Sequence, residues 1–410
     1  APPLFVGPML AYPLATANFG YSSNALQTPD GNQVSWIVTG ALGAGLQGER
    51  RGHFYGLEYE GIFSGYSESS DDSFFNSRVS AYGGHAFNLR NNVDFGVEYL
   101  DWKDPRSQDD PTQNRRNTLF ATEPDQWHST RIGANYVYGA PDARGRLECA
   151  ACQTWLRFDN NGQELRDRDV LDLGASLAAR VSPKTDLLVG ITYTDFDYIN
   201  QDPRAVAEGL DISSIETRYY AGAEWDITPK TATSLQVGLL NKDFDDNSSR
   251  SDYSRPFWVL DLEWSPRGRT NLLGGYSRYL YESVAYYPEL VKTSLDDYVE
   301  VESLHAAWDE QWSPRLFSNI TGYVNDENYT PGNRSDDVYG VFGNVTYHVN
   351  RWLGVGVNAY YRQRDSSERV FDYEDKGVGL TLNLGGLLGW GAKAPPACNV
   401  RRLIPNVRIY

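Results

Sequence analysis

Hydrophobic and polar residues alternate with a period of two along much of the chain, most regularly between Asp211 and Trp264. Within that stretch one set of alternate positions is apolar or aromatic, and the other is polar, charged or small. The two sets are Ile215, Thr217, Tyr219, Ala221, Ala223, Trp225 and Ile227, and Glu216, Arg218, Tyr220, Gly222, Glu224 and Asp226. A period of two places successive side chains on opposite faces of an extended chain, whereas a helix repeats every 3.6 residues. The pattern therefore predicts a β-strand.

A short turn containing Pro and a basic residue follows four such segments. Its four versions are Val181-Ser182-Pro183-Lys184-Thr185, Ile227-Thr228-Pro229-Lys230-Thr231, Trp264-Ser265-Pro266-Arg267 and Trp312-Ser313-Pro314-Arg315. Polar loops of about ten to fifteen residues separate them, and an aromatic residue usually stands near the short turn. Short turns at one end and long loops at the other are typical of an outer-membrane β-barrel. A soluble β-sandwich is the alternative.

Along the whole chain the pattern predicts an all-β fold, a transmembrane antiparallel β-barrel of about eighteen strands. We expect nine long outer loops, eight short periplasmic turns and a barrel that spans residues 1–388. The longest loop, Lys103–Asp125, is the candidate for a constriction inside the barrel. Residues 389–410 form a proline-rich, basic tail, for which we expect a role as a plug or docking segment at the periplasmic side.

Composition restricts the class of protein but does not indicate a function. The mean hydropathy of −0.52 suits a soluble protein but also a barrel, in which only alternate strand residues face lipid. The uncharged runs Ala1–Pro29 and Gly377–Ala392 are broken by Pro, Asn or Gly, so neither predicts a membrane helix. The start, Ala1-Pro2-Pro3, is interpreted as a mature terminus after removal of a signal peptide.

The net charge of −17 argues against nucleic acid as a partner and against docking on anionic membrane surfaces.

Three cysteines are present, Cys149 and Cys152 in a CxxC and Cys398 in the tail. A zinc site would need further ligands, and a thioredoxin-like site would need a βαβ context, so a disulfide is expected instead. Parity with Gln153 and Arg157 predicts that Cys149 faces the lumen and Cys152 faces outward. Because a bridge within CxxC would join opposite faces of a strand, Cys149 and Cys398 are the disulfide candidates. A free Cys398 is the alternative.

From about Tyr193 onward, several motifs resemble a family of β-barrel porins associated with exopolysaccharide and capsule export. They are Tyr193–Tyr198, Asp243–Asp246, Asn350–Gly356 and Tyr360–Ser366, with a looser match at Gly7-Pro8, Tyr12 and Gly20–Asn24. The resemblance implies a channel in the outer membrane of a Gram-negative bacterium that passes a secreted polysaccharide from a periplasmic partner. The added tail departs from the family pattern.

Catalysis would require a histidine beside a serine or carboxylate. The five histidines are scattered singly and belong to no recognisable motif; they are His53, His85, His128, His305 and His348. We therefore expect no enzyme activity, no cofactor and no metal.

The barrel phase also predicts which side chains line the channel. They are Asp94, Glu98, Asp172, Arg180, Glu216, Arg218, Tyr220, Glu224, Asp226, Asp261, Glu263, Asn358, Tyr360, Arg362 and Arg364. The set is mixed in charge with an acidic bias, which favours a neutral polymer or cations over an anionic polymer. The alternative is that these charges pair across strands and only rigidify the wall.

Acidic pairs recur at the ends of the predicted outer loops. They are Asp71-Asp72, Asp109-Asp110, Asp245-Asp246, Asp296-Asp297 and Asp336-Asp337. Such pairs can bind calcium or bridge to lipopolysaccharide. Their spacing matches no closed calcium loop, so solvated rim charge is the preferred interpretation.

The function expected from these observations is outer-membrane export of an exopolysaccharide without catalysis. The alternatives are a general cation-preferring diffusion porin and a structural or adhesive barrel. The expected partners are outer-membrane lipid, lipopolysaccharide, the polysaccharide cargo and a periplasmic export component.

Overall fold

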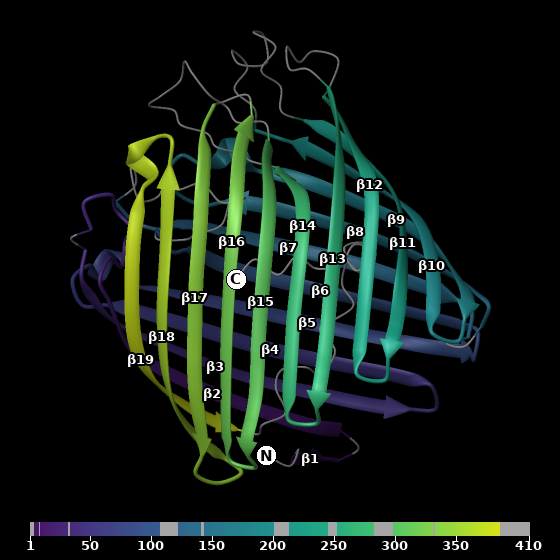
Figure 1. Cartoon of the computed structure of the whole chain (residues 1–410), viewed down its shortest axis with the longest axis horizontal. Coiled ribbons are helices and arrows are strands. Elements are labelled where there is room, and N and C mark those ends of the chain that lie inside the picture. The colour runs from purple at the N-terminus through teal and green to yellow at the C-terminus, as the bar shows by residue number, and fades with distance from the viewer. Residues whose placement is uncertain are drawn as a thin grey trace.

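The computed structural model describes residues 4–7, 9–31, 33–106, 122–140, 143–200, 213–244, 252–282, 298–330 and 333–385. They form one antiparallel sheet that closes into a barrel (Figure 1). Eighteen strands of 13 to 16 residues make the wall, each paired with the next along the chain. The barrel closes where β19 (Tyr373–Gly385) pairs with β2 (Met9–Ser22). A nineteenth strand of three residues, β1 (Leu4–Val6), pairs with β2.

The remaining strands follow in chain order around the wall. They are β3 (Ser35–Arg50), β4 (His53–Tyr66), β5 (Phe74–Asn88), β6 (Asn91–Asp104), β7 (Asp125–Tyr138), β8 (Gly145–Phe158), β9 (Arg168–Ser182), β10 (Thr185–Tyr198), β11 (Ser214–Thr228), β12 (Thr231–Phe244), β13 (Tyr253–Arg267), β14 (Thr270–Glu282), β15 (Tyr298–Ser313), β16 (Leu316–Thr330), β17 (Ser335–His348) and β18 (Leu353–Ser366). The predicted all-β barrel of about eighteen strands is confirmed.

Helical structure in the described ranges is limited to three single turns, η1 (Ser70–Asp72), η2 (Glu164–Arg166) and η4 (Arg369–Phe371). Within those ranges, no helix has the length and apolar character needed to cross a membrane.

The connections between strands differ at the two ends of the barrel, as Figure 1 shows. Eight connections of two to six residues lie at one end, the short-turn end, and nine lie at the other, the loop end, as predicted. The turn at Pro229-Lys230 joins β11 to β12 where expected. At the third version of the repeat, β13 continues through Arg267, and the turn falls at Gly268-Arg269. A matching irregularity lies between Trp225 and Thr228 in β11, and in both strands the turn begins four residues after the Trp. Pro266 stands only two residues after Trp264, so a turn placed at this Pro is two residues early.

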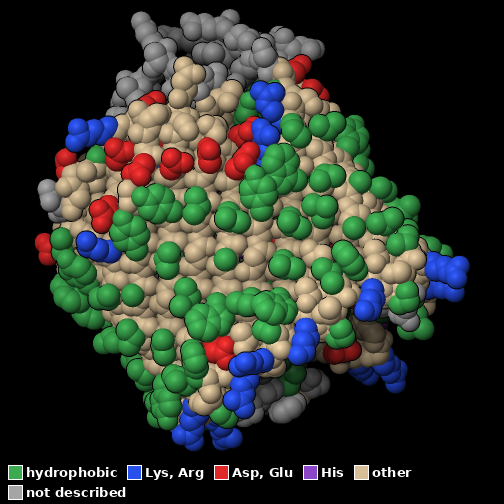
Figure 2. Space-filling model, in the orientation of Figure 1, with side chains coloured by type: hydrophobic (Ala, Val, Ile, Leu, Met, Phe, Trp, Pro, Cys, Tyr) green, Lys and Arg blue, Asp and Glu red, His purple; other side chains and the backbone are tan. Residues whose placement is uncertain are grey.

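An apolar belt covers the outside of the wall, as seen on the face in Figure 2. Along β13 the side chains of Leu260, Leu262 and Trp264 are 40%, 44% and 46% exposed, while Val259 on the opposite face is 2% exposed. Trp225, Trp264 and Trp312 lie on the outer face close to short turns. Exposed apolar side chains flanked by aromatic residues are what a barrel embedded in lipid requires.

The prediction of which β8 side chains face the lumen is wrong. In its register Cys149 pairs with Tyr136, an exposed outer-face residue, whereas Cys152 pairs with Asp172 on the inner face. Gln153 pairs with Ile132 and therefore also faces outward, so it was a misleading marker of the lumen.

The cysteine chemistry follows the corrected phase. Cys149 is a free thiol, while Cys152, which is 2% exposed, is disulfide-bonded. The predicted bridge from Cys149 to Cys398 is therefore wrong. Cys398, the tail 389–410 and positions 107–121 of the candidate constriction loop lie outside the described residues.

Candidate channel interior

The structure places all fifteen predicted channel residues on the inner face, opposite the exposed apolar side chains. They come from five strands of the wall: Asp94 and Glu98 on β6; Asp172 and Arg180 on β9; Glu216, Arg218, Tyr220, Glu224 and Asp226 on β11; Asp261 and Glu263 on β13; Asn358, Tyr360, Arg362 and Arg364 on β18. That solutes pass along these residues remains a prediction.

Many of the inner charges are paired. Arg180 Nε donates to Asp186 Oδ1 at 2.9 Å across β9 and β10, and Arg78 Nε donates to Glu98 Oε2 at 2.7 Å across β5 and β6. Further pairs join Arg218 to Glu216, Arg362 to Asp375 and Arg364 to Glu327. Pairing across strands stiffens the wall, so these residues are poor candidates for solute binding.

A cavity of about 680 Å³ lies at the short-turn end of the inner wall, between β9 and β15. We call it the short-turn cavity. Four of its lining carboxylates make no ion pair with Lys or Arg in the described chain: Glu224, Asp226, Asp261 and Glu263. Arg180 and Lys184 also line it, but Arg180 is already paired with Asp186. The cavity therefore carries negative charge that is free to attract cations.

His305 is a lining residue of the short-turn cavity that sequence reasoning missed. Asp261 and His305 both pair with Gly275, which stands between them on β14. A Cβ added at Gly275 would lie 2.3 Å from His305 Cε1 and 2.8 Å from Asp261 Oδ1. The absent side chain lets the imidazole and the carboxylate approach each other over the strand. Only the parity of His305 on β15 could have indicated this inner position.

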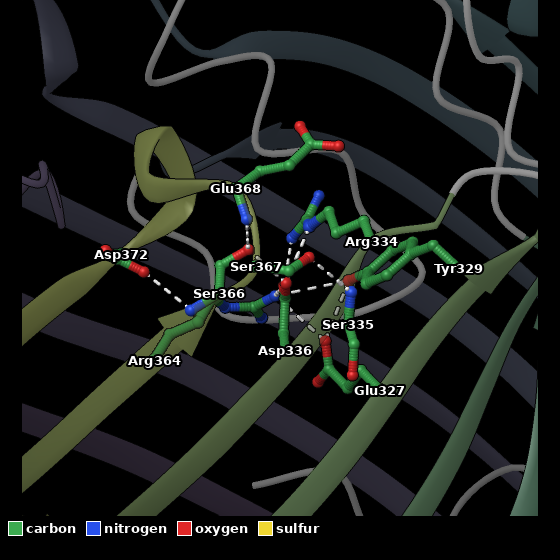
Figure 3. A network of polar contacts seen from close by, with 10 residues as sticks. All are labelled: Glu327, Tyr329, Arg334, Ser335, Asp336, Arg364, Ser366, Ser367, Glu368 and Asp372. Carbon is green, nitrogen blue, oxygen red and sulfur yellow. Dashed lines mark hydrogen bonds and ion pairs between the residues drawn. The ribbon is translucent and has the colours of Figure 1, made fainter.

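At the loop end, the inner wall of β16 to β18 is covered by a buried network of charges, drawn in Figure 3. Arg364 Nη1 lies 3.0 Å from Glu327 Oε2 and 2.5 Å from Asp336 Oδ2, and donates to the Tyr329 hydroxyl at 3.3 Å. The side chains of Arg364, Glu327 and Asp336 are at most 1% exposed. A water-filled bore would hydrate these groups, so this part of the wall is covered.

Residues of two loops belong to that network. Arg334, between β16 and β17, pairs with Asp336 through Nε at 2.9 Å. Its guanidinium lies 4.1 Å from the ring centroid of Tyr329 and 3.5 Å from that of Phe371 in η4. The cation is thus held between two aromatic rings and a carboxylate, which fixes the loops against the inner wall.

Two of the predicted rim pairs are divided between buried and exposed positions. Asp72 is 1% exposed and pairs with Arg106, and Asp336 is fully buried, while Asp71 and Asp337 are exposed. Solvated rim charge is therefore wrong for Asp72 and Asp336. In β17 the reason is strand alternation, which places consecutive residues on opposite faces. Asp109-Asp110, Asp245-Asp246 and Asp296-Asp297 include positions outside the described residues.

Buried carboxylates also hold other loops. At the seam between β19 and β2, Asp375 accepts from Ser22 Oγ at 2.7 Å and from the Asn24 amide at 3.0 Å. Before β9, Asp167 accepts from the Phe158 amide at 2.7 Å and from Asn200 at 2.8 Å. Burial raises the pKa of the Asp167 carboxyl above its usual value, although these hydrogen bonds oppose that shift.

Aromatic rings in the middle of the inner wall are also covered. Tyr82, Tyr220 and Tyr323 are 5%, 5% and 8% exposed. Each lies over a glycine of a neighbouring strand; for Tyr220, a Cβ at Gly190 would come within 2.2 Å of the ring. These rings therefore pack flat against the inner wall, while the short-turn cavity leaves carboxylates accessible.

Other polar chemistry in the described chain offers little for catalysis. His53 and His85 stack with ring centroids 4.1 Å apart, and His128 contacts Asp159. Within the described ranges no three His, Cys, Asp or Glu side chains converge as a metal ion would require.

Comparison with known proteins was informative at the family and fold levels. The family model described as "Putative beta-barrel porin 2" matches residues 4–385. No curated protein sequence matches the chain.

Solved structures with a similar fold are outer-membrane barrels. OccK2 of Pseudomonas aeruginosa is 13% identical, with a TM-score of 0.52, over 92% of this chain and 98% of that chain. The same protein in complex with glucuronate is 11% identical, with a TM-score of 0.51 and the same coverage. The FrpB iron transporter of Neisseria meningitidis is 10% identical, with a TM-score of 0.47, over 91% and 82%. At these identities the likeness to OccK2 shows the fold alone.

Proposed function

The chain belongs to the putative beta-barrel porin 2 family, whose model spans residues 4–385, and from this premise we propose that it is a channel for polysaccharide export. The channel lies in the bacterial outer membrane, as its family and its fold indicate. The more specific proposal, export of a polysaccharide, is based on the geometry of the inner wall.

The observation that carries the proposal is the asymmetry of the lumen. On the described inner wall, the short-turn cavity carries unpaired carboxylates, whereas the loop end of β16 to β18 is covered by the buried pairs of Arg364 and Arg334. In outer-membrane barrels the short turns face the periplasm. A cargo therefore meets an open vestibule from the periplasmic side, which suits export better than uptake.

The charge of the vestibule restricts the cargo. Glu224, Asp226 and Glu263 are exposed and unpaired with cations within the described chain. They repel a polyanion at the point of entry. A neutral or weakly charged polysaccharide fits best, and we propose no catalytic step on it.

A cation-preferring diffusion porin is the second candidate. The same carboxylates favour it, because they would raise the local concentration of small cations without binding a sugar. The two functions differ in whether an oligosaccharide occupies the lumen.

Current through single barrels in a planar bilayer tests the proposal. A neutral oligosaccharide added at the short-turn side should block the current reversibly, and an oligouronate of equal length should block it less. The variant Asp337→Asn, changed at an exposed outer position, should behave like the unmodified protein. A steady current that no oligosaccharide blocks would leave the diffusion porin as the function. Stronger block by the oligouronate would contradict the assigned cargo charge.

A further inference from the structure

Each of the eight short turns carries one basic residue. These residues, which we call the basic ring, are Arg51, Arg90, Arg144, Lys184, Lys230, Arg269, Arg315 and Arg351. Arg50 and Arg267 add two more cations at the ends of β3 and β13. All ten are exposed, and none forms an ion pair within the described part of the chain. A ring of this kind is unexpected in a chain with a net charge of −17.

Carboxylates do not neutralise the basic ring. The described turn residues include no Asp or Glu, and the sequence adds only Asp142, in the turn between β7 and β8. Glu49 stands at the end of β3. The carboxylates Glu224, Asp226 and Glu263 are near the same end but belong to the inner wall. Toward the outside, the ring therefore presents a positive surface around the whole circumference.

The basic ring lies just beyond an aromatic level on the lipid face. Trp225, Trp264 and Trp312 are 48%, 46% and 54% exposed and precede turn cations Lys230, Arg269 and Arg315 by three to five residues. At a strand rise of about 3.3 Å per residue and with tilted strands, the cations sit roughly 10 Å beyond the Trp level. Trp favours the headgroup level, and flexible Lys and Arg side chains can reach back toward it.

We propose that the basic ring binds the phosphate groups of anionic phospholipids, such as phosphatidylglycerol, in the periplasmic leaflet. The complementary charges attract, and the even distribution over all eight turns matches a leaflet that surrounds the barrel on every side. An acidic protein docked on one arc would engage only some of the turns. Arg351 also lies over the ring of Trp352 at 5.6 Å, which holds one cation of the ring beside an aromatic residue.

The opposite end of the outer wall carries the opposite charge. Glu302, Asp326, Asp337 and Asp365 are successive partners in the register of β15 to β18 and share the outer face. Figure 2 shows acidic side chains in a row toward the loop end of this face and basic side chains along the short-turn end. On this face, anionic phospholipid therefore meets attractive charge at the short-turn end and repulsive charge at the loop end.

Spin-labelled lipids provide the test, independently of any cargo. The unmodified barrel in phosphatidylcholine bilayers should bind labelled phosphatidylglycerol in preference to labelled phosphatidylcholine. The preference should weaken at 1 M salt, where the screening length falls to about 3 Å. It should also weaken in the double variant Arg315→Gln/Arg351→Gln. The salt series on the unmodified protein keeps the proposal testable if the variant does not fold.

The matched control is Arg369→Gln/Lys376→Gln, which removes two exposed cations at the loop end. It should retain the full preference for phosphatidylglycerol. The proposal is overturned if the unmodified protein shows no preference, if salt leaves the preference unchanged, or if the control loses as much as the ring variant. Crosslinking of the ring to an acidic periplasmic protein, without any lipid preference, would likewise assign the ring to that protein.

Discussion

At the scale of single residues, neighbours of the same type have opposite environments. Asp336 is fully buried and contacts Arg334 and Arg364, whereas Asp337 is exposed on the outer wall. The difference is set by the strand face that each side chain occupies. The buried carboxylate of Asp336 is stabilised by its neighbouring guanidinium groups, whereas the exposed carboxylate of Asp337 is stabilised by water.

Removal of Arg364 tests that dependence. Arg364→Met should lower the free energy of unfolding by about 3–5 kcal/mol, because Glu327 and Asp336 lose the cation between them. Asp337→Asn, one position from Asp336, should change it by less than about 0.5 kcal/mol. Urea unfolding of the refolded barrels measures both. Equal effects would show that the network does not stabilise the loop end.

Gly275 offers a second comparison between adjacent residues. Gly275→Ala places a methyl group against His305 and Asp261 and should cost roughly 1–3 kcal/mol of stability. At Gly274, on the other face, the nearest atom to an added Cβ is 3.8 Å away, so Gly274→Ala should be nearly neutral. Thermal unfolding distinguishes the pair. A neutral Gly275→Ala would mean that His305 and Asp261 are not held together over the strand.

The cysteines show where prediction from single residues fails. Parity was counted from Gln153 and Arg157, which are polar but lie on the outer face of β8. Arg157 stands at the loop end of β8, whereas Gln153 lies within the apolar belt beside Ile132 and Leu171, so its polarity indicated the wrong face. The register with Ile132 and Tyr136 corrects the phase, and this long-range pairing is not readable from one strand.

At the scale of elements, alternation was the strongest signal. Strands β11 to β13 have the predicted faces, and the register of β11 with β12 follows from the two-residue turn at Pro229-Lys230. The repeat of that turn allowed the strand and turn numbers to be predicted. The turn after β13 was expected two residues too early, because it follows Trp264 at the distance at which the turn after β11 follows Trp225, and not at the position of Pro266.

Arginine placed on either face of β12 tests the assigned phase. Val237 is 49% exposed on the apolar belt, and Val237→Arg should cost about 2–4 kcal/mol near the bilayer midplane. Ser234 lines the short-turn cavity, and Ser234→Arg should cost much less because the new charge stays in water. Folding into lipid vesicles at increasing urea concentration measures the two costs. Similar costs would contradict the phase.

At the scale of the whole molecule, charged residues are distributed unevenly between the two ends of the barrel. The net charge therefore does not describe either end. The net charge of −17 predicted no contact with anionic membranes, yet the basic ring surrounds the short-turn end. The inner wall is acidic at that end, and on β16 to β18 it is covered by paired charges at the other. Neither the ring nor the buried network follows from composition, since both depend on which residues the barrel brings to one level.

The most direct test of the account is the reversal potential of the barrel in a salt gradient. A channel that opens through the short-turn cavity should be cation-selective, because Glu224, Asp226, Asp261 and Glu263 line its entry. The combined change Glu224→Gln, Asp226→Asn, Asp261→Asn and Glu263→Gln should bring the reversal potential close to zero. Anion selectivity in the unmodified protein, or unchanged cation selectivity in the combined variant, would contradict it.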